Sequence, residues 1–133
     1  MTDNAPVSYD QAFDDLSAVY LEDSWVLAVA AAASQIRFIL DAVLTPDHPS
    51  YSVPSVNEQH CYCRGTLTIR SVDPIDFVPS GQPGTHDPSG EIDFGNIDTF
   101  RRVELAGVSV WQLAGDWGTA SVRRPLVVLT LDA

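Results

Sequence analysis

Residues 108–131, VSVWQLAGDWGTASVRRPLVVLTL, hold the clearest structural signal in this sequence. Valine and tryptophan favour strands, and the Gly115-Asp116 pair in the middle favours a turn. Pro125 lacks the N–H that a strand ladder needs, so we expect a bulge or a sheet edge near residues 123–125. The stretch therefore predicts two strands around a Gly-Asp turn, on which the other β segments pack.

A tryptophan stands on each side of this turn. In a strand over residues 108–113, side chains alternate between the two faces, so Ser109, Trp111 and Leu113 share one face. Large aromatic side chains near a turn can form the floor of a carbohydrate or peptide groove, but more often they bury their large area in a core. We predict that Trp111 and Trp117 belong to the core.

The pattern Trp-x-Leu-x-Gly-x-Trp-Gly at residues 111–118, followed by a β-rich tail, is similar to stretches of small bacterial β proteins, including some immunity proteins of toxin systems. The resemblance covers little beyond this pattern and includes no catalytic motif. It implies a binding protein more than an enzyme.

Residues 59–70 form the second clear strand. Gly65 in its middle indicates a bulge or the close approach of another backbone. Cys61 and Cys63, one residue apart in a strand, lie at the limit of disulfide reach, so we expect free thiols. One face is predicted to carry Cys61, Cys63, Leu67 and Ile69, and the other His60, Tyr62, Arg64, Thr66, Thr68 and Arg70.

Residues 21–44 allow more than one interpretation. The alanine run favours a long helix, and a membrane span is long enough on paper, although Asp41 argues against it. Alternation over residues 36–44 and the β-favouring residues 25–29 instead indicate a hairpin with the alanine run at its tip. We favour the hairpin. Ile39 and Val43 interrupt the alternation, so we expect its second strand to be covered on both faces.

The rest of the chain predicts short elements between long loops. Ser8 and Gln11 have capping-box spacing, which favours a short helix over about residues 9–17. The other expected segments are a loose terminus at 1–7, a proline-rich loop at 45–54, an edge strand at 75–78, a flexible loop at 79–90 and a strand at 97–105. The sequence thus predicts one domain over residues 1–133, mainly β, as an antiparallel β-sandwich or a partly open β-barrel.

The charge of the chain restricts its partners. The formal net charge is −11, from 18 acidic residues and 7 basic ones, and every basic residue is an arginine. Nucleic acids and anionic membranes would repel such a chain, so we expect neither as a partner. A basic protein is the partner that this charge favours. The N-terminal residues lack the pattern of a signal peptide, which predicts a cytoplasmic protein.

The residues that could carry chemistry have weak patterns. The acidic segment 87–98 has the oxygen atoms that Ca²⁺ prefers, but its spacing fits a turn better than an EF-hand. The histidines and cysteines lack zinc-site spacing, and no catalytic motif is present. We therefore expect no metal or cofactor, and lean towards a protein without enzymatic activity.

Two groups of residues are the candidates for binding. Tyr62, Arg64 and Arg70 combine an aromatic ring with guanidinium groups on one strand face, as interface hot spots do. Asp93 and Asp98 belong to the acidic segment. We expect the functional surface on the loops at 45–57 and 79–98.

The resulting hypothesis is a protein-binding module, of the immunity type, that neutralises a basic partner. One alternative is a small-molecule-binding barrel or an unrecognised enzyme, with a cavity lined by Trp25, Trp111 or Trp117. A structural homodimer is the other alternative.

Overall fold

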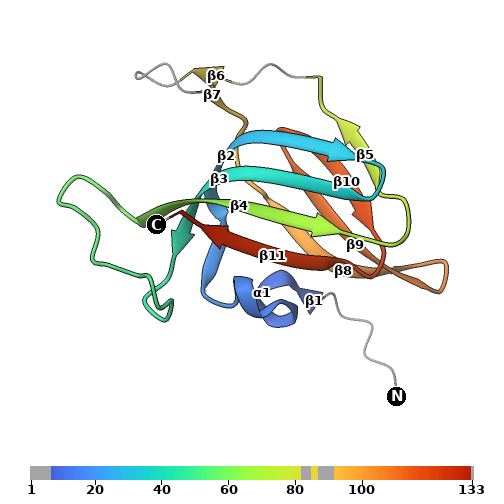
Figure 1. The fold of residues 1–133 in the computed structure, drawn as a ribbon, viewed down its shortest axis with the longest axis horizontal. Helices are drawn as coiled ribbons and strands as arrows, with labels where there is room; N and C mark the ends of the chain where they lie inside the picture. Colours follow the sequence, from blue (N-terminus) through green and yellow to red (C-terminus); the bar gives the residue numbers. More distant parts are fainter. Residues whose placement is uncertain (1–6, 82–84, 87–91, 133) are drawn as a thin grey trace.

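The fold, given by a computed structural model, is a sandwich of two antiparallel sheets, described for residues 7–81, 85–86 and 92–132 (Figure 1). Sheet A has the strand order β1-β8-β9-β10-β5, and sheet B has the order β11-β4-β3-β2. The elements are β1 (Val7–Ser8), α1 (Tyr9–Ala12), the 3-10 turn η1 (Asp14–Leu16), β2 (Val19–Ala32), β3 (Gln35–Leu44), β4 (Cys61–Arg70), β5 (Asp76–Pro79), β6 (Thr85–His86), β7 (Ile92–Asp93), β8 (Thr99–Leu105), β9 (Val108–Gly115), β10 (Gly118–Val122) and β11 (Leu126–Leu131).

This architecture confirms the predicted antiparallel sandwich, and it is not a closed barrel. No helix among the described residues is long and apolar enough to cross a bilayer. The predicted loose terminus and the flexible loop at 79–90 lie largely outside the described residues.

The stretch at residues 108–131 forms three strands in two sheets, which corrects the predicted two-stranded hairpin. β9 and β10 pair in sheet A around the expected turn. The chain then crosses between the sheets, and Leu126 begins β11, which pairs with β4 in sheet B. The interruption lies at the predicted place, since Pro125 cannot donate to a ladder and Arg124 has a φ of 46°.

Residues 21–44 form the predicted hairpin, because the alternating apolar residues of β3 enter the core. Ile36, Phe38 and Leu40 are fully buried. Two details differ from the prediction. The alanine run continues β2, with Ala32 paired to Gln35, and Ile39 is exposed on a face that was expected to be covered.

β4 has the predicted alternation, and its glycine has the predicted close neighbour. A Cβ at Gly65 would lie 2.6 Å from the carbonyl oxygen of Thr130 in β11. Cys61 and Cys63 are free thiols, as expected. The glycine therefore allows β11 to lie close against β4.

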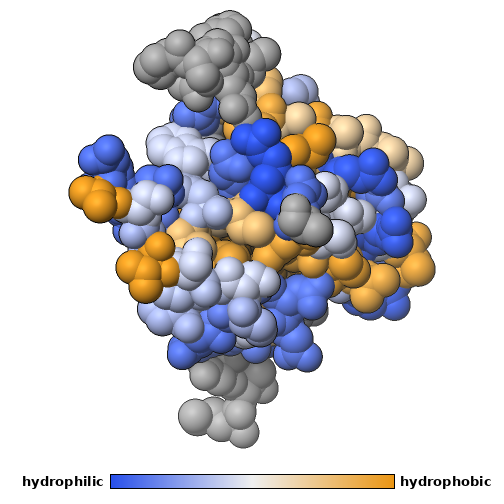
Figure 2. Space-filling view, turned by 60° about the vertical axis from the view of Figure 1, so that its left-hand side comes forward, coloured by the Kyte–Doolittle hydropathy of each residue, from blue (hydrophilic) through white to orange (hydrophobic). Residues whose placement is uncertain are grey.

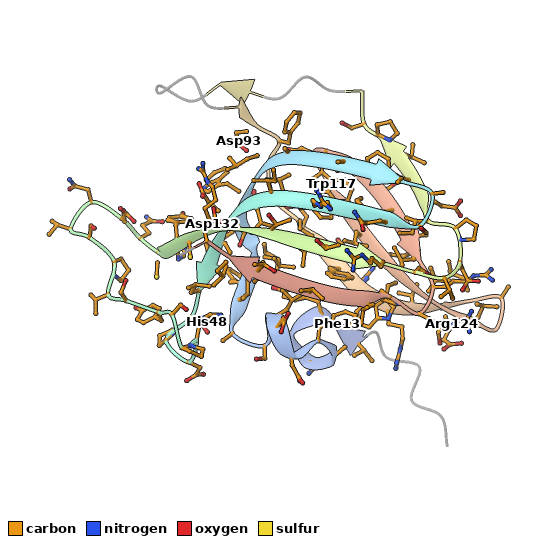
Figure 3. The ribbon with its side chains drawn as sticks, in the orientation of Figure 1. Phe13, His48, Asp93, Trp117, Arg124 and Asp132 are labelled. Carbon is orange, nitrogen blue, oxygen red and sulfur yellow. The ribbon has the colours of Figure 1, made fainter. Side chains whose placement is uncertain are left out.

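The N-terminal helix is shorter than predicted and consists of α1 followed by η1. Ser8 occupies the N-cap position in an extended conformation, but its side chain makes no capping hydrogen bond, so the expected capping box is wrong. The helix is held instead by packing. The Phe13 ring stacks 5.5 Å from Phe100 and lies 4.6 Å from Trp111, beneath sheet B in Figure 3.

Both tryptophans of the C-terminal stretch are buried in the core, as predicted. Trp117 lies between the sheets, with its ring edge-on to Phe38 at 4.9 Å and parallel to Phe77 at 6.1 Å (Figure 3). Its indole N–H donates to the carbonyl oxygen of Asn96 at 3.2 Å. One side chain therefore joins sheet A, sheet B and the connection that precedes β8.

That connection closes one side of the sandwich. The Val26 N–H of β2 donates to the Gly95 carbonyl at 2.8 Å, and the Asp98 N–H donates to the Ala114 carbonyl of β9 at 2.8 Å. The edge of sheet B is thereby linked to sheet A. Space at this junction is tight, because a Cβ at Gly115 would lie 2.2 Å from the Asn96 oxygen.

We predict that Gly115→Ala destabilises the fold by about 2 kcal/mol or more, because its methyl group has no room between Asn96 and Trp117. Urea denaturation measures the change. Gly107→Ala is the control, since its Cβ meets open space and only its φ of +80° opposes the substitution. Equal losses in the two variants would contradict the tight packing at Gly115.

Candidate binding face on sheet B

The outer face of sheet B is organised in rows that cross its strands. The residues of β2, β3 and β4 that stand opposite one another point to the same side, so each row can be read from the strand register. From one end of the sheet to the other, the rows are Tyr20–Val43–Tyr62, Trp25–Asp41–Arg64, Ala28–Ile39–Thr66, Ala30–Arg37–Thr68 and Ala32–Gln35–Arg70.

An aromatic patch, consisting of Tyr20, Trp25, Ile39 and Tyr62, occupies the first three rows. The exposed fractions of these residues are 43%, 40%, 41% and 36%. The Trp25 indole N–H lies 3.4 Å from the Tyr62 hydroxyl oxygen and donates to it. Large side chains are thus held in fixed positions on a sheet while they remain open to solvent.

A bulge in β2 places Trp25 in this patch. Between the pairs Tyr20–Val43 and Trp25–Asp41, β2 has four residues where β3 has one. Ser24 is fully buried in the bulge, and its hydroxyl accepts from the Val43 N–H at 2.9 Å and donates to the Tyr20 carbonyl at 2.8 Å. Such extra residues bend a strand and redirect its side chains.

Two polar side-chain contacts border the patch, one of them an Arg–Asp ion pair. Arg64 donates to both carboxylate oxygens of Asp41, at 2.9 and 3.1 Å. His60 lies 3.3 Å from Asp23, and its ring is edge-on to Tyr62 at 5.9 Å. Exposed pairs of this kind contribute little to stability, so their main effect is to orient the side chains around the aromatic rings.

A hollow of about 300 Å³ adjoins the patch, between sheet B and the proline-rich loop. Tyr20, which is part of the patch, and His60, which borders it, also line this hollow. Figure 2 shows a band of hydrophobic residues across the middle of this side of the molecule, bordered by hydrophilic ones. The main lining residues are Tyr20, Val43, Pro46, Tyr51, Pro54 and His60.

The five residues predicted for binding do not form one site. Tyr62 and Arg64 lie at the patch, but Arg70 is eight residues from Tyr62 along β4, about 26 Å away. Arg70 instead donates to Gln35 at 2.9 Å. The Asp93 carboxylate accepts a hydrogen bond from the Gly95 N–H at 2.6 Å. A bond of this kind belongs to a turn, which was the alternative to a Ca²⁺ site in the acidic segment.

Asp98 lies in a separate hollow of about 190 Å³, together with Tyr9 and Glu22. The Tyr9 hydroxyl donates to Glu22, and burial, followed by this bond, raises the pKa of Tyr9 well above its usual range. Burial also raises the pKa of Asp98, with smaller contributions from Asp116 and Glu22. The hollow thus holds a phenol that stays protonated beside two acids.

The surroundings of the remaining candidates for chemistry, the cysteines, the possible metal ligands and the tryptophans, favour structural roles. Burial raises the pKa of the Cys63 thiol, as do Cys61 and Asp132, and a protonated thiol is a poor nucleophile. Among the described residues, no group of three His, Cys, Asp or Glu side chains could hold a metal ion. Trp25 lies outside sheet B while Trp111 and Trp117 lie in the core, so the three tryptophans share no cavity.

Comparison with protein-family models, with curated proteins and with solved structures found no match to this chain. The function proposed below therefore rests on the geometry of this chain alone.

We predict that Ser24→Ala destabilises the fold by about 1–3 kcal/mol, because the Val43 N–H and the Tyr20 carbonyl lose their buried partner. Urea denaturation gives the free energy of unfolding. Ser55→Ala, in an exposed loop, should change it little. A loss at Ser24 no larger than at Ser55 would show that the bulge does not depend on this hydroxyl.

We expect Asp98→Asn to raise the melting temperature at pH 7 by no more than a few degrees, since the side chain is exposed. Because the pKa of Asp98 is raised in the folded protein, its carboxyl group loses a proton at a lower pH in the unfolded chain than in the folded one. The wild type therefore loses stability as pH rises from the usual Asp range through the folded-state pKa. At about pH 3 both forms are neutral, and the gain should vanish. Asp76→Asn serves as the exposed control, and a gain independent of pH would refute the explanation.

Proposed function

We propose that this protein is a binding module that recognises a basic protein partner through the aromatic patch on sheet B. The observation that carries the proposal is the exposure of three aromatic side chains on one face of sheet B: Tyr20 and Trp25 on β2, and Tyr62 on β4, with β3 between them. Tryptophan and tyrosine dominate the energetics of protein interfaces. Exposed aromatic residues gathered on one face of a sheet are the arrangement expected of a protein-binding surface.

The rigidity of the patch favours binding. Tyrosine and tryptophan have only two side-chain dihedral angles, so little conformational entropy is lost when a partner orders them. Trp25 is further restrained by its hydrogen bond to Tyr62, and its backbone position is fixed by the buried Ser24. The surface is therefore largely organised before a partner arrives.

The charges around the patch favour a basic partner. Asp23 and Asp41 border it directly, and the Asp132 N–H donates to the Arg64 carbonyl at 2.8 Å, which places a further acid beside the same row. Figure 3 shows Asp132 and His48 at this end of the sandwich. Together with the net charge of −11, these acids would speed the approach of a basic protein.

The adjoining hollow adds a place for one partner side chain. Its tyrosine and proline lining, with Tyr51 and Pro54 on the loop side, matches an apolar or aromatic group. A surface with a flat aromatic area and one pocket is typical of an interface with a central anchor. The immunity-type role, neutralisation of a basic toxin, is the form of this proposal that the charge favours.

We expect Trp25→Ala and Tyr62→Ala each to weaken partner binding by about 30-fold or more, because each removes a central anchor. Affinity purification from the native host, followed by titration of the purified partner, provides the measurement. The control is Leu105→Ala, which removes an exposed apolar side chain from sheet A.

The partner should be basic, and its association should slow as salt is raised. A partner that binds the Trp25 and Tyr62 variants as tightly as the wild type would refute this interface. Recovery of no protein, with the chain found only as a dimer in solution, would refute the function itself.

A further inference from the structure

A third hollow, of about 390 Å³, lies at the opposite end of sheet B from the aromatic patch. It forms where the β2–β3 turn, the end of β4 and the crossing from β10 to β11 meet. Figure 3 shows Arg124 at this end, away from His48 and Asp132. The lining residues are Ser34, Gln35, Arg70, Ser71, Val72, Arg124 and Leu126.

Hydrogen bonds join these three segments into one frame. The Ser71 N–H donates to the Ser34 carbonyl at 3.0 Å, which connects β4 to the β2–β3 turn. The Ser71 hydroxyl donates to the Arg123 carbonyl, which connects β4 to the crossing. The walls of the hollow are therefore positioned by backbone contacts among separate parts of the chain.

Two guanidinium groups line this frame and keep donors available. Arg70 uses its Nε in the bond to Gln35, and the described residues engage neither of its terminal nitrogens. Arg124 uses one terminal nitrogen in a bond to Asp73 at 2.8 Å. The Ser34 hydroxyl has no hydrogen bond within the described part of the chain and can donate as well.

The distribution of charge makes this end distinct. Arg70 and Arg124 line the hollow, Arg123 precedes Arg124 in the crossing, and Arg37 lies on β3 close to the β2–β3 turn. Arg37 stands one row from Arg70 on the outer face of sheet B. Asp73 pairs with Arg124. A chain with a net charge of −11 thus has two arginines lining one hollow and two more on adjoining parts of the chain.

We propose that this hollow binds a compact, multiply charged oxyanion of the phosphate class. Guanidinium groups match the oxygen atoms of such anions, and two of them, Arg70 at the end of β4 and Arg124 in the crossing, can contact one anion from two sides. A monocarboxylate needs only a single guanidinium fork, so it gains less from this arrangement. Asp73 acts as the internal competitor that holds Arg124 when no anion is bound.

To test the proposal, the purified protein is titrated with inorganic pyrophosphate, inorganic phosphate and acetate at constant ionic strength. Binding is monitored by the backbone amide chemical shifts in NMR spectra. Binding should decrease in that order and shift the backbone amide signals of residues 34–35, 70–73, 123–124 and 126. Arg70→Ala and Arg124→Ala should each weaken pyrophosphate binding about tenfold or more, which corresponds to the loss of one charged hydrogen bond.

Three further variants make the test specific. Asp73→Asn should strengthen binding because it removes the competing carboxylate. Arg70→Gln removes the charge but keeps a polar side chain, and it covers the case in which the alanine variant fails to fold. Arg102→Ala removes an equal charge from β8 in sheet A and should leave the affinity unchanged.

Equal weakening by Arg102→Ala, or equal shifts with acetate, would overturn the proposal in favour of diffuse counterion attraction. The site is independent of the proposed function: Trp25→Ala should leave pyrophosphate affinity unchanged, and failure of either proposal leaves the other intact.

Discussion

The packing of Trp117 between the two sheets is the constraint on which the rest of this structure depends. Its indole contacts Phe38 of sheet B and Phe77 of sheet A, and its N–H is satisfied by the backbone at Asn96. A buried indole needs such a partner, because an unpaired polar group in a core is costly. The connection that carries Asn96 also pairs with β2. The same contacts thus determine how the sheets stack and where one side of the sandwich closes.

The sandwich gives the outer face of sheet B two chemically different ends. β4 runs the length of this face, with Tyr62 near its start and Arg70 at its end. The first end combines exposed aromatic rings with acids, which favours a basic protein. The second end gathers arginines from three segments, which favours an oxyanion. A strand of ten residues is long enough to separate two such surfaces, so one sheet can serve two kinds of ligand.

Part of the candidate binding face could be predicted from sequence, since the alternation of side chains along β4 places Tyr62 and Arg64 on the outer face of sheet B. Trp25 could not be predicted there, because its direction depends on a bulge that is stabilised by a buried Ser24. Strand alternation placed Arg70 on the same face as Tyr62, and the structure does so, but it puts the two residues at opposite ends of β4. The functional surface was expected on loops. The proposed interface lies on a sheet, and the proline-rich loop contributes the adjoining hollow.

Local sequence is enough to predict the β character of the chain, the alternation of buried and exposed residues in β3 and β4, the burial of Trp111 and Trp117, and the interruption at Pro125. These features follow from each residue and its neighbours, because side-chain period and backbone geometry act locally. Tertiary contacts set the remaining features: the change of sheet at Pro125, the position of the bulge in β2 and the residues that meet at the three hollows. Such pairings join residues far apart in sequence, and they are selected by the shared burial of both sheets.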